Sequence, residues 1–159
     1  MTTGTVLAVA GAALAAIMSG IGSALGVGMA GRAAAGLTAE DPEKFGKALL
    51  LQLLPATQGI YGLLVAFLVL LKIGAFGDML ALSTASGWIL FASCMPMAVV
   101  GLISAVSQAK VSVAGIACIA KRPEASGKAM ILAAMVELYA IFALLIFFLG
   151  GFIPEIVLA

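Results

Sequence analysis

The sequence predicts an all-α membrane protein with four transmembrane helices, arranged as a duplicated helical hairpin. Composition, four long apolar segments and an internal repeat lead to this prediction. Of the 159 residues, 64% are hydrophobic and 9% are charged, whereas a soluble domain is about 45–50% apolar and about 25% charged. So little sequence lies outside the apolar segments that no room remains for a soluble catalytic domain.

The four predicted helices are the apolar segments, and the breaks between them contain charges and turn-forming residues. The segments cover residues 5–35, 46–73, 85–119 and 128–153. Each is longer than the run of about 20 residues that crosses a bilayer. The first and third are longer than one crossing requires, so we expect them to extend beyond the membrane beside the first and third loops.

The basic residues predict how the chain is oriented. Seven of the eight flank the first and third loops: Arg32, Lys44, Lys47, Lys110, Lys121, Arg122 and Lys128. Only Lys72 lies at the opposite side. Because basic residues are enriched in cytoplasmic loops, we expect these two loops in the cytoplasm and both termini outside.

An internal repeat relates the two halves at an offset of 81 residues. The motif Pro-Glu-x-x-Gly-Lys-Ala occurs at 42–48 and again at 123–129, and Gly20, Ser23 and Ala24 match Gly101, Ser104 and Ala105. We therefore divide the chain into a first hairpin, residues 1–80, and a second, residues 81–159. Both hairpins have the same orientation, because one repeat contains two crossings.

Glu137 is the one charged residue within the apolar stretch 129–149. A carboxylate in the middle of a membrane helix costs about 2.5–3.5 kcal/mol even on lenient insertion scales, and such residues usually serve a function. It must be protonated, paired with a cation or placed against polar partners. A purely structural role, as a protonated acid bonded to a neighbouring helix, is the alternative.

Candidate partners of Glu137 occur on two other predicted helices. Leu54, Thr57, Gln58 and Tyr61 are spaced i, i+3, i+4 and i+7, which places them on one helix face. Pro55 removes a backbone hydrogen bond there and disfavours α geometry at Leu54, so carbonyl oxygens become available as ligands. Counted from the charged loops, these groups lie at similar depths. Allowing for a shift of two residues, the first hairpin has Gln58 where the second has Glu137.

Gln108, on the third helix, lies at the same depth and completes a set of oxygen donors. One carboxylate, two amide oxygens, a hydroxyl and a carbonyl suit a hard cation. A single negative charge is neutralised by one monovalent ion, which favours Na⁺ over Ca²⁺ or Mg²⁺. A proton carrier with the same network is the alternative. Tyr61 and Tyr139 are each candidates to hydrogen-bond the carboxylate.

Glycines punctuate the first helix at Gly20, Gly22, Gly26, Gly28 and Gly31. Although the pattern resembles a dinucleotide loop, that motif requires a preceding strand, which this sequence lacks. In apolar helices, small residues four positions apart allow close backbone approach. We expect these glycines to pack helices closely, with the first helix against copies of itself in a ring.

These motifs resemble the proteolipid (c or K) subunits of V-type rotary ATPases, particularly the bacterial sodium-pumping branch. The resemblance rests on Leu-Leu-Pro-Ala-Thr-Gln-Gly-Ile-Tyr-Gly at 53–62, Ser-Gln-Ala-Lys at 107–110 and Met-Val-Glu-Leu-Tyr at 135–139. It implies Na⁺ ligands at Leu54, Thr57, Gln58, Gln108 and Glu137, with Tyr61 bonded to the glutamate. Ala56 replaces a glycine of that pattern, and Leu138 a threonine.

The resemblance also implies a function. Identical subunits would form a ring in lipid and turn against a stator membrane subunit with an essential arginine, while a central-stalk subunit links the ring to subunits that hydrolyse ATP. This chain would carry the ion without catalysing a reaction, since it has no nucleotide site, and no nucleic acid is involved. Its location would be a bacterial cell membrane. A small four-helix cation-coupled multidrug antiporter is a more distant alternative.

Overall fold

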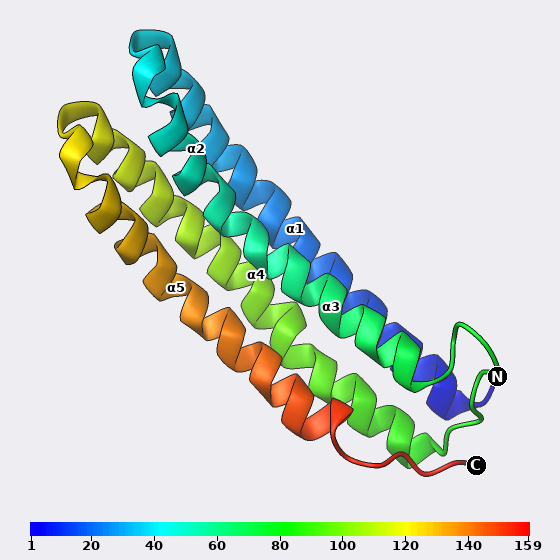
Figure 1. Cartoon of the computed structure of the whole chain (residues 1–159). Helices are drawn as coiled ribbons and strands as arrows, with labels where there is room; N and C mark the ends of the chain where they lie inside the picture. The colour runs from blue at the N-terminus through cyan, green and yellow to red at the C-terminus, as the bar shows by residue number, and fades with distance from the viewer.

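The computed structural model describes residues 1–159 as four long helical rods that run side by side in two antiparallel hairpins (Figure 1). The first and third rods are continuous helices, α1 (Thr3–Glu40) and α4 (Thr84–Lys121). The second rod consists of η1 (Pro42–Lys44), α2 (Phe45–Leu53), η2 (Leu54–Ala56) and α3 (Thr57–Lys72). The fourth rod consists of η3 (Pro123–Ala125), α5 (Ser126–Phe147) and η4 (Phe148–Phe152). All four rods are long and apolar enough to cross a membrane, which confirms the predicted fold class.

The central contact of the bundle joins α1 to α4 along their length. The rod containing α3 packs on α1, and α5 packs on α4, while α3 and α5 share few contacts. The two hairpins therefore meet mainly through their first helices. Most of the large side chains on α5 face outward, including Ile131, Leu132 and Phe142, as expected of a helix that borders lipid.

Two glycines of the predicted stripe allow α1 to approach α4 closely. A Cβ at Gly22 would lie 2.6 Å from the Leu102 Cα, and a Cβ at Gly26 would lie 2.9 Å from the Ala105 carbonyl oxygen. Any side chain at these positions would push α4 away. The close approach that small residues permit in membrane helices thus occurs within one chain.

The other glycines of the predicted stripe lie elsewhere. A Cβ at Gly31 would lie 2.8 Å from the Gln52 side chain, so this glycine faces the second rod. Gly20 and Gly28 have open space where a side chain would project. The stripe therefore faces more than one direction, and no other part of the chain covers Gly20 and Gly28.

Pro55 interrupts the second rod. Because proline has no N–H to donate, the rod narrows over Leu54–Ala56 to a short 3₁₀ turn between α2 and α3. Leu54 itself keeps α-helical angles, with φ −55° and ψ −45°, so the expected departure from α geometry at Leu54 is wrong, and the effect of the proline is the change of hydrogen bonding in the 3₁₀ turn. α5, which has no proline, runs unbroken at the corresponding level.

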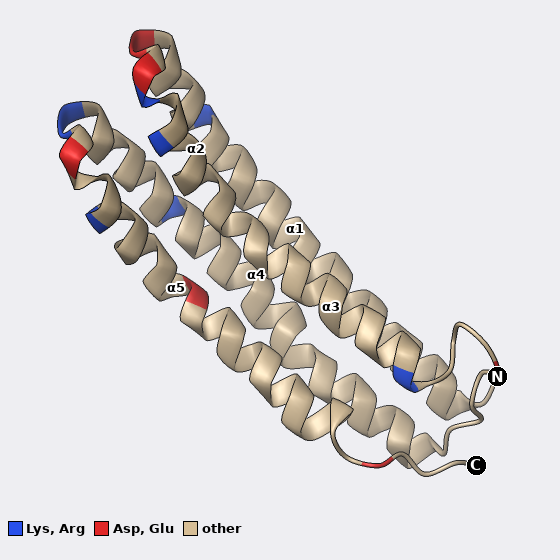
Figure 2. Cartoon of the chain, in the orientation of Figure 1, with Lys and Arg blue, Asp and Glu red and all other residues tan.

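The charged side chains gather at one end of the bundle, around the two short connections η1 and η3 (Figure 2). Asp41 caps η1 and forms an ion pair with Lys44 at 3.0 Å, and the Lys44 ammonium lowers the pKa of the Asp41 carboxyl. The Lys44 and Lys47 ammonium groups also donate to the Ala120 and Pro123 carbonyls. These bonds join the two connections to each other.

The opposite end of the bundle holds both termini and the loop between α3 and α4. The Thr5 hydroxyl donates to the Leu80 carbonyl at 2.9 Å. The backbone of the C-terminal tail pairs with the same loop, from the Ser83 N–H to the Val157 carbonyl at 3.0 Å and from the Ala159 N–H to the Ala81 carbonyl at 2.7 Å. The first and last residues of the chain are thus attached to one loop.

Lys72 links the two hairpins at this end of the bundle. Its ammonium donates to the carbonyls of Gly151, Phe152 and Pro154 at 2.8, 2.5 and 2.5 Å. These carbonyls lie at and beyond the end of the fourth rod, where helix geometry provides no partner. One side chain of the first hairpin thereby caps the last helix of the second.

Replacing Lys72 with Met should loosen this cap while retaining most of the side chain's volume. We expect local opening of residues 151–159 to become easier by about 1–2 kcal/mol, which is the range for lost bonds to a charged donor that is partly exposed to solvent. Hydrogen exchange followed by mass spectrometry in detergent would report this as faster exchange of the tail. Lys128→Met, at an exposed lysine without a hydrogen-bond partner, is the matched control and should leave tail exchange unchanged.

Candidate functional site

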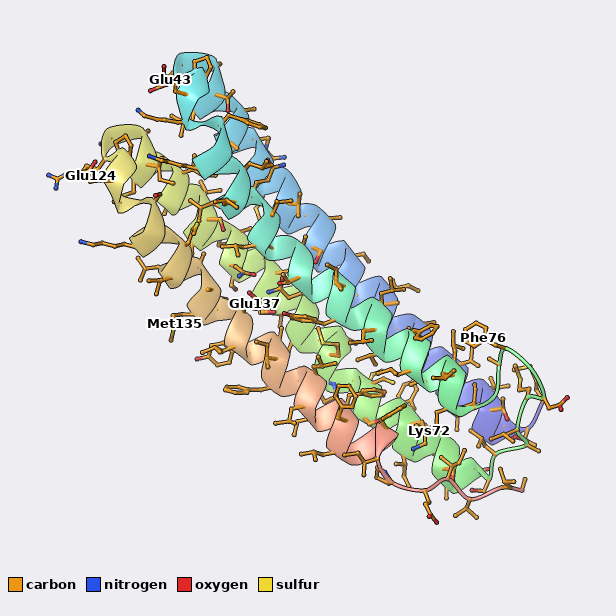
Figure 3. All side chains as sticks on the ribbon, viewed as in Figure 1. Glu43, Lys72, Phe76, Glu124, Met135 and Glu137 are labelled. Carbon is orange, nitrogen blue, oxygen red and sulfur yellow. The ribbon has the colours of Figure 1, made fainter.

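Glu137 lies at mid-length on α5, and its side chain points into the bundle (Figure 3). It is half-buried. The Tyr61 hydroxyl of α3 donates to its Oε1 at 2.5 Å, a length typical of a hydroxyl bonded to a carboxylate. Met135, two residues earlier, points to the outside of the same helix. The carboxyl group therefore lies at the contact between the two outer helices.

Two glutamine side chains meet beside it. The Gln58 Nε2 donates to the Gln108 Oε1 at 2.7 Å, and both side chains have 0% exposure. The Gln108 Nε2 in turn donates to the Ala133 carbonyl of α5 at 3.2 Å. A buried amide without a partner would be costly, and here α3, α4 and α5 satisfy one another's polar groups.

Helix spacing places these two sets of bonds at the same level of the bundle. On the second rod, Gln58 and Tyr61 are three residues apart, and on α5, Ala133 and Glu137 are four residues apart. Positions three or four apart lie on the same helix face. The Tyr61–Glu137 bond and the bonds from Gln58 through Gln108 to Ala133 are therefore two separate sets that lie within about one helical turn of each other.

Thr57 and Leu54 extend the bonds of the two glutamines at the 3₁₀ turn. The Thr57 hydroxyl donates to the Leu54 carbonyl at 3.0 Å and also lies 3.3 Å from the Gln58 Oε1. The structure thus joins Leu54, Thr57, Gln58 and Gln108 in one hydrogen-bond network and places the bonded pair Tyr61 and Glu137 at the same level of the bundle.

Ser23 of α1 supports this turn, which the sequence alone did not indicate. Its hydroxyl accepts from the Gly59 N–H at 2.7 Å and donates to the Ala56 carbonyl at 3.4 Å. It holds the backbone that flanks Thr57 and Gln58. The Ala133 carbonyl was also not anticipated, because backbone acceptors within an unbroken helix leave no mark in the sequence.

Tyr139 does not take part in the network. Its side chain is 64% exposed and packs edge-on against Phe142. Of the two tyrosines considered as partners of Glu137, the structure selects Tyr61.

The site offers hard oxygen atoms and a single acidic group. The one salt bridge of the chain lies at the loop end, between Lys44 and Asp41, so no lysine or arginine neutralises Glu137. No cluster of three histidine, cysteine, aspartate or glutamate side chains is present. Such a set suits a small monovalent cation or a proton rather than a transition metal.

A bundle of two antiparallel membrane hairpins, with one carboxyl at mid-depth on its last helix, defines an ion-carrying membrane protein. The family model for the C subunit of ATP synthase matches residues 10–69 and again residues 91–149. The chain therefore belongs to the family of ATP synthase C subunits. The two matches fall on α1 with the second rod and on α4 with the fourth, so each hairpin is one family unit.

Two curated relatives are similar over most of the chain. The V-type sodium ATPase subunit K of Enterococcus hirae is 52% identical over 146 residues, which are 92% of this chain and 90% of that protein. The A-type ATP synthase subunit K of Methanocaldococcus jannaschii is 40% identical over 141 residues, which are 89% of this chain and 60% of that protein. These similarities confirm the resemblance inferred from the motifs.

Replacing Tyr61 with Phe should free a carboxyl oxygen of Glu137 while preserving the ring of the side chain. We expect dicyclohexylcarbodiimide to modify Glu137 roughly tenfold faster, because a bond to a charged group contributes about 1.5–3 kcal/mol before solvent compensates. Mass spectrometry of the modified peptide gives the rate. Tyr139→Phe, at the exposed tyrosine, should react at the rate of the unchanged chain; equal acceleration in both variants would contradict the assignment.

Proposed function

We propose that this chain is the rotor-ring subunit of a rotary V-type ATPase and carries Na⁺ across the membrane on Glu137, coupled to ATP hydrolysis by other subunits. The observation that carries the proposal is that three helices bring one carboxyl group, two buried amides and a threonine hydroxyl to the same level of the bundle. The 52% identity with a V-type sodium ATPase subunit K supports Na⁺ as the ion.

The Na⁺ ligands in this proposal are the Leu54 carbonyl, the Thr57 hydroxyl, the Gln58 and Gln108 amide oxygens and the Glu137 carboxylate. In the structure the four groups other than the carboxylate hydrogen-bond to one another. Na⁺ coordinated by all five oxygen atoms would take the place of those hydrogen bonds. The Tyr61 hydroxyl is not a ligand in this proposal, and its bond to Glu137 holds the carboxylate against α3.

Charge balance explains how such a site travels through lipid. An unpaired carboxylate at the bilayer centre is costly, whereas one carboxylate with one Na⁺ is neutral. A divalent ion would leave a net positive charge. Each Na⁺-loaded copy of the chain is therefore able to cross the lipid-facing arc of the ring.

Exchange of the ion requires a second membrane protein. We propose a stator subunit whose arginine displaces Na⁺ from Glu137, with access for the ion from each side of the membrane. Rotation would be driven by a central-stalk subunit that contacts the ring at its loop end. The charged connections at η1 and η3, linked by Lys44 and Lys47, form a rigid surface for that contact.

The proposed location is a bacterial cell membrane with both termini outside. Seven of the eight basic residues lie toward the end formed by the short connections (Figure 2). That distribution favours a cytoplasmic position for η1 and η3. The loop that carries Lys72 and the two termini then lie on the outer side.

Protection of Glu137 by Na⁺ tests the choice of ion. Dicyclohexylcarbodiimide should modify Glu137 in the purified oligomer, and Na⁺ should slow the modification at constant pH, because bound Na⁺ occupies the carboxylate. Labelling rates at a series of NaCl concentrations, with choline chloride holding ionic strength constant, give the apparent affinity. A labelling rate that changes with pH but not with NaCl concentration would contradict Na⁺ as the ion and would favour H⁺.

Direct binding of ²²Na⁺ with a ligand variant tests the site itself. Glu137→Gln should abolish binding, since it removes the charge that balances the ion. Thr57→Val, which deletes one oxygen while keeping the branched shape, should weaken binding. Thr38→Val is the matched control, because the Thr38 hydroxyl bonds its own helix at the loop end; an equal loss of binding in the control would contradict the ligand assignment.

A further inference from the structure

The Ser112 hydroxyl of α4 is the one buried side-chain oxygen or nitrogen of the chain without a hydrogen-bond partner. Ser112 has 0% exposure, and a buried polar group without a partner is costly. Two other serines buried on this helix donate to a carbonyl of the preceding turn. Ser93 donates to the Leu90 carbonyl at 2.8 Å. Ser104 donates to the Gly101 carbonyl at 3.5 Å. Ser112 forms no such bond, so a partner must come from elsewhere.

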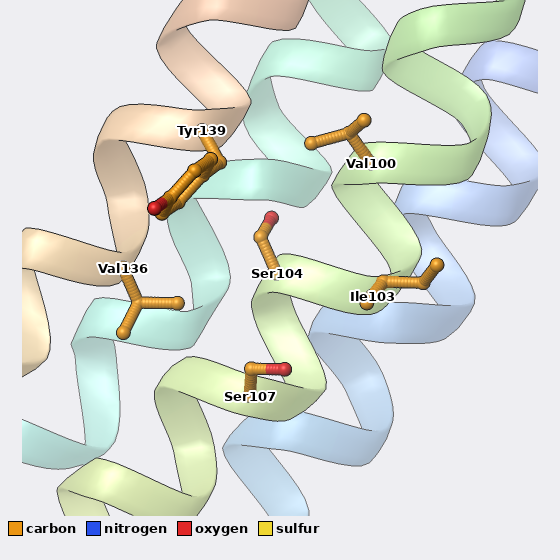
Figure 4. A pocket seen from close by; sticks show the side chains of 6 residues that line it. All are labelled: Val100, Ile103, Ser104, Ser107, Val136 and Tyr139. Carbon is orange, nitrogen blue, oxygen red and sulfur yellow. The ribbon is translucent and has the colours of Figure 1, made fainter.

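The Ser112 side chain points into the bundle, away from the groove that lies between α4 and α5. Ser107 and Tyr139 line that groove (Figure 4). Ser112 follows Ser107 by five residues, which turn a helix by about 140°. Ala109 and Gly115, three residues before and after Ser112, share its helix face. Because both are small, α4 itself leaves space beside the hydroxyl.

The second rod lies opposite this face of α4. A Cβ at Gly115 would lie 3.0 Å from the Leu51 Cδ1, and Gln108 bonds Gln58 further from the loop end. Seven residues separate these two contacts on each helix, and the two helices are antiparallel. Ser112, which lies between Gln108 and Gly115, is therefore level with the 3₁₀ turn η2.

A carbonyl oxygen at this level lacks its helical donor. In an α-helix the Leu51 carbonyl accepts from the N–H of residue 55, but residue 55 is a proline and has no N–H. Helix carbonyls point toward the C-terminal end of the helix, so the Leu51 oxygen is directed at the turn. Leu51 has 0% exposure. Two buried oxygens, one on α4 and one on the second rod, are thus short of partners at one level.

We propose that one buried water molecule binds between the Ser112 hydroxyl and the Leu51 carbonyl. The serine hydroxyl donates to the water oxygen, and the water donates to the carbonyl. Buried waters are typically held by two to four polar groups that would otherwise be unsatisfied, and these two oxygens meet that requirement.

Charge favours a water over a cation at this place. Neither α2 nor α4 contains an acidic residue, so a bound cation would have no negative partner on the helices that hold it. An uncompensated charge at membrane depth is costly. A water molecule is neutral and is able to donate and accept at once, as this pair of oxygens requires.

The water links α4 to the turn that carries the proposed ligands Leu54 and Thr57. On α1, the Ser23 hydroxyl already bonds the Ala56 carbonyl and the Gly59 N–H, which lie at and beyond the end of that turn. The water holds the beginning of the same turn. This site goes beyond the proposed function and does not depend on which ion Glu137 carries, so either proposal is able to fail without the other.

Electron cryomicroscopy of the purified oligomer, at a resolution that shows ordered waters, tests the site directly. We expect density for one water within hydrogen-bond distance of both the Ser112 Oγ and the Leu51 carbonyl oxygen. Ser112→Ala should lose that density while keeping the helices in place. A direct bond from Ser112 to a carbonyl, or a Ser112 hydroxyl with no water beside it, would overturn the proposal.

The sign of a stability change gives a second, independent test. Ser112→Ala releases the water and leaves the Leu51 carbonyl without a partner, so the midpoint of thermal unfolding should fall by about 2–4 °C. Without a bound water, the same change would remove an unsatisfied hydroxyl and add a better helix former, and the midpoint would rise. Circular dichroism of the purified oligomer gives the midpoint.

Ser93→Ala is the matched control for this measurement. Ser93 is also buried on α4, but its hydroxyl bonds the Leu90 carbonyl of its own helix, and that carbonyl keeps its helical donor when the hydroxyl is removed. We therefore expect a smaller change than in Ser112→Ala. A midpoint of Ser112→Ala that is unchanged, raised or equal to that of the control would contradict the bound water.

Discussion

The structure depends on the cost of one carboxyl group in the middle of an apolar helix. Glu137 has no cationic partner in its own chain, so polar atoms must come from other helices, and each of these must itself be satisfied. The Tyr61 hydroxyl bonds the carboxyl group, and the paired amides of Gln58 and Gln108 with the Ala133 carbonyl satisfy one another at the same level. This requirement fixes how α3, α4 and α5 face one another at this level.

Close packing of α1 on α4 makes that arrangement possible. At Gly22 and Gly26 of α1, the backbone of α4 lies where a side chain would otherwise project. This close approach brings the outer rods near enough for Tyr61 to reach Glu137. Ser23, between these glycines, holds the backbone on either side of Thr57 and Gln58. The first helix therefore contributes none of the proposed Na⁺ ligands but positions the turn that carries Thr57 and Gln58.

Much of this could be predicted from the sequence, because helix rise converts residue number into depth. The four crossings, the repeat and the common level of Gln58, Gln108 and Glu137 all follow from counting. Depth does not specify which way a residue faces across a contact between helices. That is why Tyr139 could not be separated from Tyr61, and why Gly22 and Gly26, which pack on α4 of the same chain, were expected against other copies.

Duplication followed by divergence links the site to the assembly. Two identical hairpins would present identical contacts within and between subunits, and every contact would carry the same polar groups. Here the two hairpins have diverged at this level: the first has Thr57 and Gln58 where the second has Val136 and Glu137. The first hairpin therefore has a neutral amide where the second has a carboxyl group, and that amide bonds Gln108 of the second hairpin. Each chain of two hairpins then has one carboxyl group at mid-depth, and the first hairpin provides the Tyr61 hydroxyl that bonds it.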